Sequence, residues 1–321
     1  MGAVPALRIP FIIGSGSGGC RIASKLAIPG VRRICVNSSW RDLDSLPGDV
    51  VKVRCGDGSG SGMSPEKGAK DYLKMGGREG LLEAVDRILS EEAVSKDHVD
   101  VVPIIISAGF GFGSGSGPMI VEDMSKAFPK AAVIAWVTLP FFYEGEEVRG
   151  NALKCFKAVA SRAATIAIDN QHVAESAGIS LTIKDIFSRI NMKISDDILT
   201  LLRAATSTNT LTTIDRSDLK KVLGNGAMLM FSSSLQPDAS DYSRLFNSGS
   251  SLSPYAPGER RYKVRALAVI QAPRAPSPAE LSKLVSQCEE ALNVRLKAFK
   301  TVIALGGEKL KVSMLLGGLG Y

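Results

Sequence analysis

A buried strand that runs straight into a glycine string dominates this sequence. Residues 101–106 are apolar, uncharged and rich in β-branched side chains, which is typical of a parallel strand covered on both faces. Every second residue from Gly109 to Gly117 is then a glycine, and Pro118 suits the first turn of a following helix. Such a bare backbone lets a phosphate group approach main-chain N–H groups. A flexible Gly-Ser linker has the same composition, but the preceding strand and the amphipathic residues 120–128 favour the phosphate loop.

The string Gly-Ser-Gly-Ser-Gly occurs three times, at residues 14–18, 58–62 and 113–117. Three copies in three loops predict one shared ligand. Gly14, Gly16 and Gly19 also satisfy the G-x-G-x-x-G pattern of dinucleotide-binding proteins, which needs an acidic residue after the next strand. That strand, residues 33–36, ends at Asn37. An NAD-dependent oxidoreductase therefore remains an alternative, although the sequence lacks the acidic residue that would bind the ribose.

Length and composition indicate one large or two ordinary globular domains, because the chain has 321 residues of which 45% are hydrophobic. Residues 1–7 carry no signal-peptide pattern, and the longest apolar run, residues 131–143, is too short to span a bilayer. The five cysteines are scattered, which argues against a disulfide framework. We therefore expect a cytoplasmic protein without a transmembrane segment. His98 and His172 have no partners for a zinc site or a Ser-His-Asp triad.

The formal net charge of +7 raises the possibility of a nucleic-acid partner. The basic residues are mostly dispersed, however. Their densest group, residues 260–265, alternates like a strand with one charged face, which indicates a solvated sheet edge. We expect no nucleic-acid partner.

Strands and helices alternate through the first half of the chain, which predicts an α/β fold with a parallel sheet. Apolar residues then recur at helical spacing over residues 183–202, indicating one long helix. A new short helix opens near Asp215, and residues 232–257, rich in serine and proline, indicate a long connection. The remainder predicts a smaller α/β domain. We expect a nucleotide-binding domain over residues 1–180, a central helix over 181–205 and a C-terminal domain over 206–321.

Three motifs resemble the phosphate-binding loops of the tubulin/FtsZ superfamily of polymerising GTPases. Residues 111–117, which contain the third glycine string, are similar to the family signature G-G-G-T-G-S/T-G, with Phe112 in place of a glycine and Ser114 in place of a threonine. Residues 16–26 resemble the first phosphate loop, and residues 62–68 resemble G-G-N-P-E-x-G. The resemblance implies that the phosphates of GTP or GDP, with Mg²⁺, are held by Gly16, Ser17, Gly18, Gly19, Cys20, Arg21, Gly62, Gly111, Phe112, Gly113, Ser114, Gly115, Ser116 and Gly117.

Two further motifs resemble the family's sugar and base contacts. Residues 140–145 match the P-F-x-x-E-G loop, which implies that Glu144 holds the ribose; the family's arginine four residues later is Val148 here, with Arg149 next. The Ile-Asp-Asn sequence ending at Asn170 implies a guanine contact, and Phe187 and Asn191 fall where the family stacks and reads the base. The apolar neighbours of Phe187 alone favour a simple core residue.

An acidic pair follows the long helix. Asp215 and Asp218 match the carboxylates of the family's N-x-D-x-x-D loop, in which Thr213 replaces the asparagine. The resemblance implies that they enter the nucleotide site of the next subunit and position the attacking water. Without it, they are a helix cap and a solvated acid.

The resemblance thus implies a GTPase that polymerises head to tail with itself and is activated by that self-association, in cell division or a related cytoskeletal process. A membrane-anchoring adaptor is not identifiable from these residues. A related regulator that binds GTP but hydrolyses or polymerises poorly is the second possibility, because Phe112, Thr213 and the shifted Arg149 depart from the family pattern.

Overall fold

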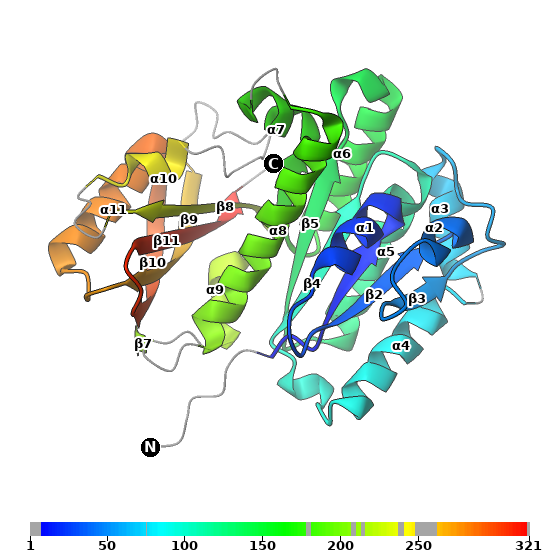
Figure 1. Cartoon of the computed structure of the whole chain (residues 1–321), viewed down its shortest axis with the longest axis horizontal. Coiled ribbons are helices and arrows are strands. Elements are labelled where there is room, and N and C mark those ends of the chain that lie inside the picture. Colours follow the sequence, from blue (N-terminus) through cyan, green and yellow to red (C-terminus); the bar gives the residue numbers. More distant parts are fainter. Residues whose placement is uncertain are drawn as a thin grey trace. The chain divides into compact units, whose positions relative to one another are not determined.

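The computed structural model describes residues 8–74, 76–177, 181–206, 210–212, 216–236, 241–247 and 262–319. The chain divides into two compact units, one formed by Arg8–Asn191 and the other beginning at Met192. The boundary falls inside the helix α8 (Ile183–Thr206), shown in Figure 1. The long helix expected from the apolar spacing therefore exists. None of the helices in the described part of the chain is long and apolar enough to cross a membrane.

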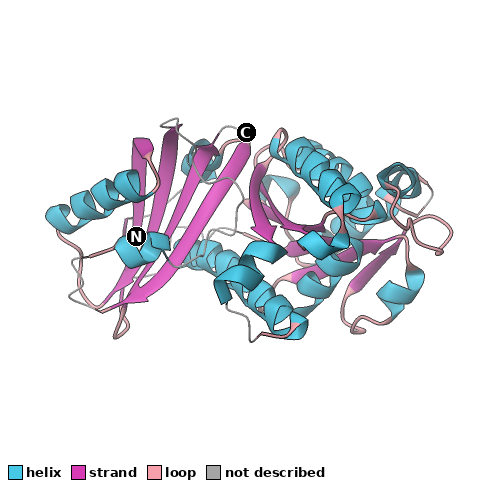
Figure 2. Ribbon diagram, turned by 90° about the horizontal axis from the view of Figure 1, so that it is seen from above, coloured by secondary structure: helices cyan, strands magenta, loops and turns pink. Residues whose placement is uncertain are grey.

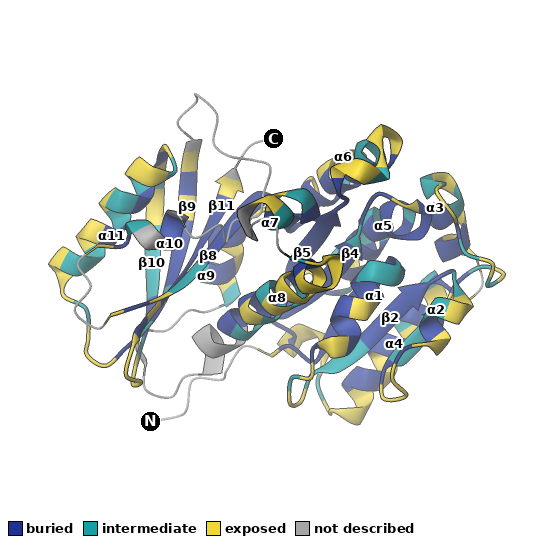
Figure 3. Cartoon of the chain, turned by 45° about the horizontal axis from the view of Figure 1, so that its top comes forward, coloured by how far each residue is buried: buried dark blue, intermediate teal, exposed yellow. Residues whose placement is uncertain are grey.

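The first unit is built on a sheet in which every described pairing is parallel, in the order β3-β2-β1-β4-β5-β6. Its strands are β1 (Phe11–Ser15), β2 (Arg32–Asn37), β3 (Val51–Arg54), β4 (Val101–Ser107), β5 (Ala132–Leu139) and β6 (Ala164–Asp169). The alternation of strands and helices predicted this arrangement, and the prediction is confirmed. β5 and β6 are buried at every residue, so both faces of the sheet are covered (Figure 3).

Helices cover this sheet, as Figure 2 shows. They are α1 (Gly16–Lys25), α2 (Trp40–Asp44), α3 (Pro65–Leu73), α4 (Arg78–Glu91), α5 (Gly111–Ala127), α6 (Glu146–Ala160) and α7 (Asn170–Ala177). Short 3₁₀ turns lie at Lys96–His98 and Phe142–Glu144. Ser64 caps α3 by accepting a hydrogen bond from the N–H of Lys67, and Pro65 occupies its first turn.

The glycine strings are partly helical, which corrects one expectation. We expected a bare loop to Gly117 and a helix from Pro118, but α5 begins at Gly111 and contains Pro118. The physical reason is helix packing. A β-carbon on Gly115 would stand 2.6 Å from the Ala69 nitrogen of α3, so only glycine lets the two helices approach this closely.

The second unit contains a mixed sheet, in the order β8-β11-β9-β10-β7. Its elements are β7 (Thr210–Thr212), α9 (Arg216–Leu223), β8 (Gly226–Leu235), α10 (Ser243–Asn247), β9 (Tyr262–Ala272), α11 (Pro278–Ala291), β10 (Val294–Leu305) and β11 (Leu310–Leu319). β9 and β10 are parallel, whereas β11 pairs antiparallel with β8 and β9. The smaller α/β domain is therefore present.

The prediction of a long connection over residues 232–257 is wrong for its first residues. β8 continues to Leu235, and α10 lies within the same stretch. Serines are common in turns, so the sequence did not indicate a strand here. In the structure, Ser232 shares a hydrogen bond of 2.7 Å with Ser313 of the neighbouring β11. Residues 237–240 and 248–261 lie outside the described part of the chain.

Candidate functional site

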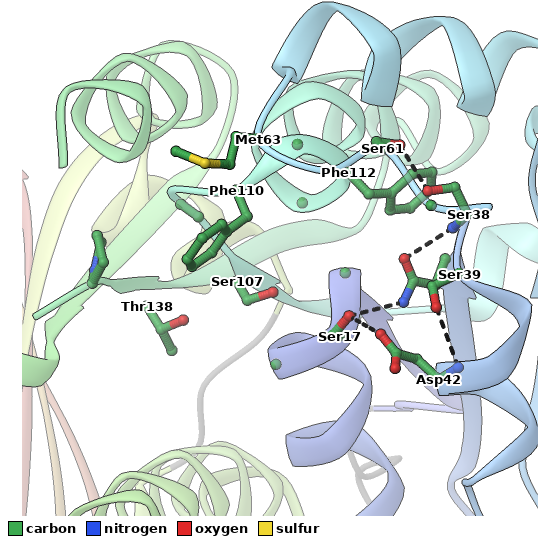
Figure 4. A pocket seen from close by; sticks show the side chains of 18 of the residues that line it. Ser17, Ser38, Ser39, Asp42, Ser61, Met63, Ser107, Phe110, Phe112 and Thr138 are labelled. Atoms are coloured by element: carbon green, nitrogen blue, oxygen red, sulfur yellow. Dashed lines mark hydrogen bonds between the residues drawn. The ribbon is translucent and has the colours of Figure 1, made fainter. Parts of the chain in front are cut away.

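A pocket of about 490 Å³ opens in the first unit at the carboxyl ends of its parallel strands (Figure 4). Many of its lining residues directly follow or end β1, β2, β4, β5 and β6, and others come from the loop before α3 and from α2 and α8. β1 and β4 are neighbours in the sheet although two strands separate them in the sequence. Such a reversal of strand order creates a crevice above the sheet, and this is where open α/β sheets bind ligands.

All three glycine strings reach this pocket. They contribute Gly16, Ser17 and Gly18 from the first, Gly60, Ser61 and Gly62 from the second, and Gly113 from the third, which is joined by Gly111 and Phe112 just before it. Gly16 has a φ of +75°, and a β-carbon on it would stand 3.1 Å from the backbone of Gly113. The N–H of Gly111 donates to the carbonyl oxygen of Gly62 at 2.7 Å. The strings thus pack backbone against backbone around one cavity, as expected for one shared ligand.

Several residues predicted to touch phosphate lie behind the pocket and do not line it: Gly19, Cys20, Ser114, Gly115, Ser116 and Gly117. Ser114 accepts from the N–H of Gly109 at 2.7 Å, and Ser116 shares a hydrogen bond of 2.9 Å with Ser15. The Cys20 thiol donates to the carbonyl of Gly14, and its burial raises its pKa. These groups fix the positions of the loops, which is a different role from contacting a ligand.

Glu144, Asn170 and Phe187 also line the pocket. A Glu144 carboxylate oxygen accepts from the N–H of Phe141 at 2.7 Å. Asn170 is buried, and no group in the described part of the chain bonds its side-chain oxygen. A buried acceptor without a partner costs about 1–3 kcal/mol, so this oxygen suits a donor supplied by a ligand.

The interpretation of Phe187 as a core residue is wrong, because the residue is 46% exposed. Its ring meets Phe141 edge to face, with 5.9 Å between the ring centroids. One side of the ring is therefore supported by protein while the residue lines the cavity. An aromatic ring in this position offers a surface on which a flat ligand group can stack.

Arg149 and Asn191 are not among the lining residues. Arg149 donates to the carbonyl of Pro140 at 2.6 Å, pairs with Asp169 at 3.3 Å, and places its guanidinium 4.2 Å from the centre of the Phe142 ring. It therefore braces the loop that carries Glu144. Asn191 lies one helical turn beyond Phe187 in α8 and is partly exposed.

The sequence interpretation missed part of the lining, namely Asn37, Ser38, Ser39, Asp42, Gly60, Ser61, Met63, Ser107, Ala108, Phe110, Thr138 and Pro140. Most of them share one signal that was available: they follow or end a parallel strand, and such ends meet at one edge of the sheet. Asp42 has no such signal, because it lies in the short helix α2 and reaches the pocket only through folding.

The acidic pair belongs to the second unit. Asp218 lies in the first turn of α9 and forms an ion pair of 2.8 Å with Lys300 of β10. Asp215 and Thr213 lie outside the described residues. The catalytic role of Asp215 and Asp218 therefore stays a prediction.

Comparison with known proteins identifies the family. Residues 11–178, which include all three glycine strings, match the model of the Tubulin/FtsZ family, GTPase domain. This chain belongs to the tubulin/FtsZ family. The family's GTPase domain binds GTP and GDP, so the first glycine string is not the fingerprint of an NAD-dependent oxidoreductase.

The relatives of this tubulin/FtsZ protein include archaeal and bacterial members. Tubulin-like protein CetZ of Pyrococcus abyssi is 31% identical over 224 residues, which are 66% of this chain and 57% of the relative. Cell division protein FtsZ of Aquifex aeolicus is 29% identical over 228 residues, 68% of this chain and 57% of the relative. The matches therefore span little more than half the length of these relatives.

Solved structures show the same fold. CetZ2 from Haloferax volcanii, a GTPgS-bound protofilament, has a TM-score of 0.74 at 21% identity and covers 97% of this chain and 93% of that one. The empty FtsZ dimer of M. jannaschii has a TM-score of 0.69 at 20% identity, covering 98% and 89%. The expected tubulin/FtsZ fold is confirmed.

Proposed function

We propose that this chain binds GTP in the pocket described above, hydrolyses it to GDP and phosphate, and assembles head to tail into filaments. The nucleotide phosphates lie against the three glycine strings, and the base lies between Asn170 and Phe187. The observation that carries this orientation is the buried, unpartnered oxygen of Asn170. Guanine presents N–H donors on its edge, and one of them satisfies this acceptor.

Hydrolysis of this kind needs positioned groups more than a protein nucleophile. Backbone N–H groups of the glycine strings stabilise charge on the phosphates, and Mg²⁺ supplies further neutralisation when bound. Asp215 and Asp218 of a neighbouring subunit orient the attacking water. Self-association therefore completes the hydrolytic site and activates it, and a contact between two different surfaces propagates as a filament.

Two solved relatives support the assembly, since one is described as a protofilament and another as a dimer. The names of two relatives, a tubulin-like protein CetZ and a cell division protein FtsZ, support a cytoskeletal role, with cell division as one possibility. The test is sedimentation of the full chain with GTP, GDP and a non-hydrolysable GTP analogue, together with phosphate release. We expect pelleting with GTP and the analogue but not with GDP. Absence of GTP binding would overturn the proposal.

A regulator that binds GTP but turns it over poorly is the second candidate. Phe112 adds a large buried side chain to a loop otherwise made of glycine and serine, and Asp218 is held by Lys300 within its own chain. Both features can slow hydrolysis without preventing binding. Turnover per subunit, measured below and above the concentration at which polymer forms, separates the two candidates: it rises steeply for a polymerising GTPase and stays low for a regulator.

A further inference from the structure

The net positive charge of the chain has no part in the proposed function, and it is unevenly distributed. Residues 192–321 hold 17 lysines and arginines against 11 acidic residues, whereas residues 1–191 hold 22 against 21. The second unit therefore carries almost all of the excess. Such asymmetry between two parts of a chain is typical of a surface that meets a partner of opposite charge.

Part of this charge gathers on β9 and β10, which lie side by side in the sheet of the second unit (Figure 1). Their register places Lys263 opposite Arg295, and Arg265 opposite Ala298. Directly paired residues and alternate residues of one strand share a face of the sheet, so Lys263, Arg265 and Arg295 lie together. Lys297 lies at the irregularity of β10 just before Ala298. We call Lys263, Arg265, Arg295 and Lys297 the basic strip.

The charges of the basic strip are not neutralised by nearby acids. All four residues are exposed, and none of them forms an ion pair in the part of the chain that the structure describes. Asp218 is engaged by Lys300, and Glu289 accepts from the N–H of Leu296 at 2.6 Å. Glu290, also in α11, has no ion pair with the strip. Like charges directly opposite each other on neighbouring strands destabilise a sheet, so the strip has a cost that an anionic partner removes.

Protection of an open sheet edge does not account for the whole strip. Lysines often guard an unpaired edge strand against aggregation, and the pattern of residues 260–265 indicated such an edge. In the structure, however, β9 lies between β11 and β10, and Arg265 is paired on both sides, with Gly317 and Ala298. The prediction of a sheet edge is therefore wrong for Arg265, whose charge has another purpose.

The surroundings of the strip favour an acidic peptide over other polyanions. Single-stranded nucleic acids bind where bases stack on aromatic rings, and membrane surfaces take up exposed aromatic or large aliphatic side chains. Among the described residues 263–318, Leu305 is the only large hydrophobic residue that is exposed, and it ends β10. Alternate side chains of an extended peptide are about 6.6 Å apart, which is also the spacing of Lys263 and Arg265 along β9. A peptide with acids at alternate positions therefore matches the strip.

We propose that the basic strip is a docking surface for an extended acidic segment of another protein. Three acidic residues at consecutive alternate positions occur nowhere in this chain, so a second copy does not provide the segment. Carboxylates of the bound segment face Lys263, Arg265 and Arg295 and accept charge-assisted hydrogen bonds from them. The surface belongs to the second unit, whereas the nucleotide pocket is lined by the first.

The test uses the full chain and a fluorescently labelled synthetic peptide of alternating glutamate and serine, with binding followed by anisotropy. The wild type should bind this peptide with an affinity that falls as salt rises, and should not bind the same peptide with glutamine in place of glutamate. Lys263→Glu should weaken binding about tenfold or more, because it replaces an attraction by a repulsion. The matched control is Lys283→Glu, which changes the net charge equally at an exposed position of α11 and should keep the wild-type affinity.

Stability gives a second readout. Lys263→Glu turns the like-charged pair with Arg295 into an oppositely charged pair, so the urea midpoint should rise while the affinity for the peptide falls. A lower midpoint would contradict the repulsion on which the proposal rests. If Lys263→Glu does not fold, Arg295→Gln is titrated instead, and an unchanged affinity overturns the proposal.

Three further results would also overturn it. The first is a wild type that does not bind the acidic peptide. The second is a loss of affinity in Lys263→Glu no larger than that in Lys283→Glu, which would indicate net charge alone. The third is displacement of the peptide, at equal concentrations of negative charge, by a single-stranded oligonucleotide or by vesicles containing phosphatidylserine, which would assign the strip to one of those polyanions.

Discussion

Gly115 of α5 lies against Pro65 at the start of α3, so closely that a β-carbon on Gly115 would overlap the Pro65 carbonyl oxygen. Gly68 of α3 shows the same relationship from the other side, since its β-carbon would overlap the backbone of Gly111 and stand 2.8 Å from the α-carbon of Phe112. The glycines of the third string therefore have two functions: some face the ligand pocket, and others allow two helices to touch.

The first prediction concerns this helix contact. Gly115→Ala should lower the free energy of unfolding by about 1–3 kcal/mol or more, because the added methyl group meets backbone that cannot move aside. Urea denaturation of the full chain measures the change. Gly150→Ala is the matched control: Gly150 lies inside α6 with open space at its β-carbon, and alanine should stabilise that helix by about 0.5–1 kcal/mol. Equal effects at the two positions would contradict the packing argument.

The second prediction concerns base recognition. Asn170→Ala should weaken GTP binding by about 1–3 kcal/mol, because the guanine donor loses its buried acceptor. The preference for GTP over ATP should shrink by a similar amount. Asn191→Ala, at a residue outside the lining, should cost less. Competitive titration of GTP and ATP with each variant measures these differences, and a wild type with equal affinity for both nucleotides would refute the assignment.

The third prediction concerns the shared hydrolytic site. Asp218→Ala should still bind GTP and sediment with it, but release phosphate slowly. Lys300→Ala breaks the same ion pair and keeps the carboxylate, so it should retain hydrolysis. This pair of variants separates loss of the acid from loss of the ion pair. Equal phosphate release by Asp218→Ala and the wild type would show that Asp218 takes no part.

A mixing experiment tests whether the acid acts on a neighbour, and it is the fourth prediction. Ser17→Glu places a negative charge beside the phosphates and should prevent GTP binding, while leaving Asp218 intact. Mixed with Asp218→Ala, it should restore part of the hydrolysis, because each subunit supplies what the other lacks. The mixture needs nucleotide-free subunits to dock, which cosedimentation of the two variants checks. Docking without any restored turnover would place the hydrolytic site within one subunit.

The fifth prediction concerns alkaline pH. Burial raises the pKa of Cys55, Cys155 and Cys288 from 9.0 to about 12. The folded state therefore holds thiol protons that the unfolded state releases above pH 9, and stability should fall as the pH rises from 9 toward 12. Urea denaturation at pH 8 and pH 10.5 measures the loss. Cys155→Ala should show a shallower loss, and rapid alkylation of native thiols at pH 8 would contradict their burial.

The sequence by itself determined the layout of the nucleotide-binding unit. Uncharged β-branched runs such as residues 101–106 can be stable only between two covered faces, and their alternation with helices requires parallel strands. The three glycine strings can likewise be recognised from the local sequence alone. Gly16, Gly62, Gly111, Glu144 and Asn170 could be chosen because each lies in a motif that resembles one of the family's, and all five line the pocket.

Only the tertiary structure decided which of these residues face the pocket. Gly115 looks the same as Gly113 in the sequence, yet it packs against α3, because the orientation of a helical residue depends on its neighbours in space. Ser17 and Asp42 are 25 residues apart, and Ser15 and Ser116 are 101 apart, yet each pair is joined by a hydrogen bond. Local patterns carry no information about such contacts, since they form when β1, β2 and β4 align side by side and bring distant loops to one edge of the sheet.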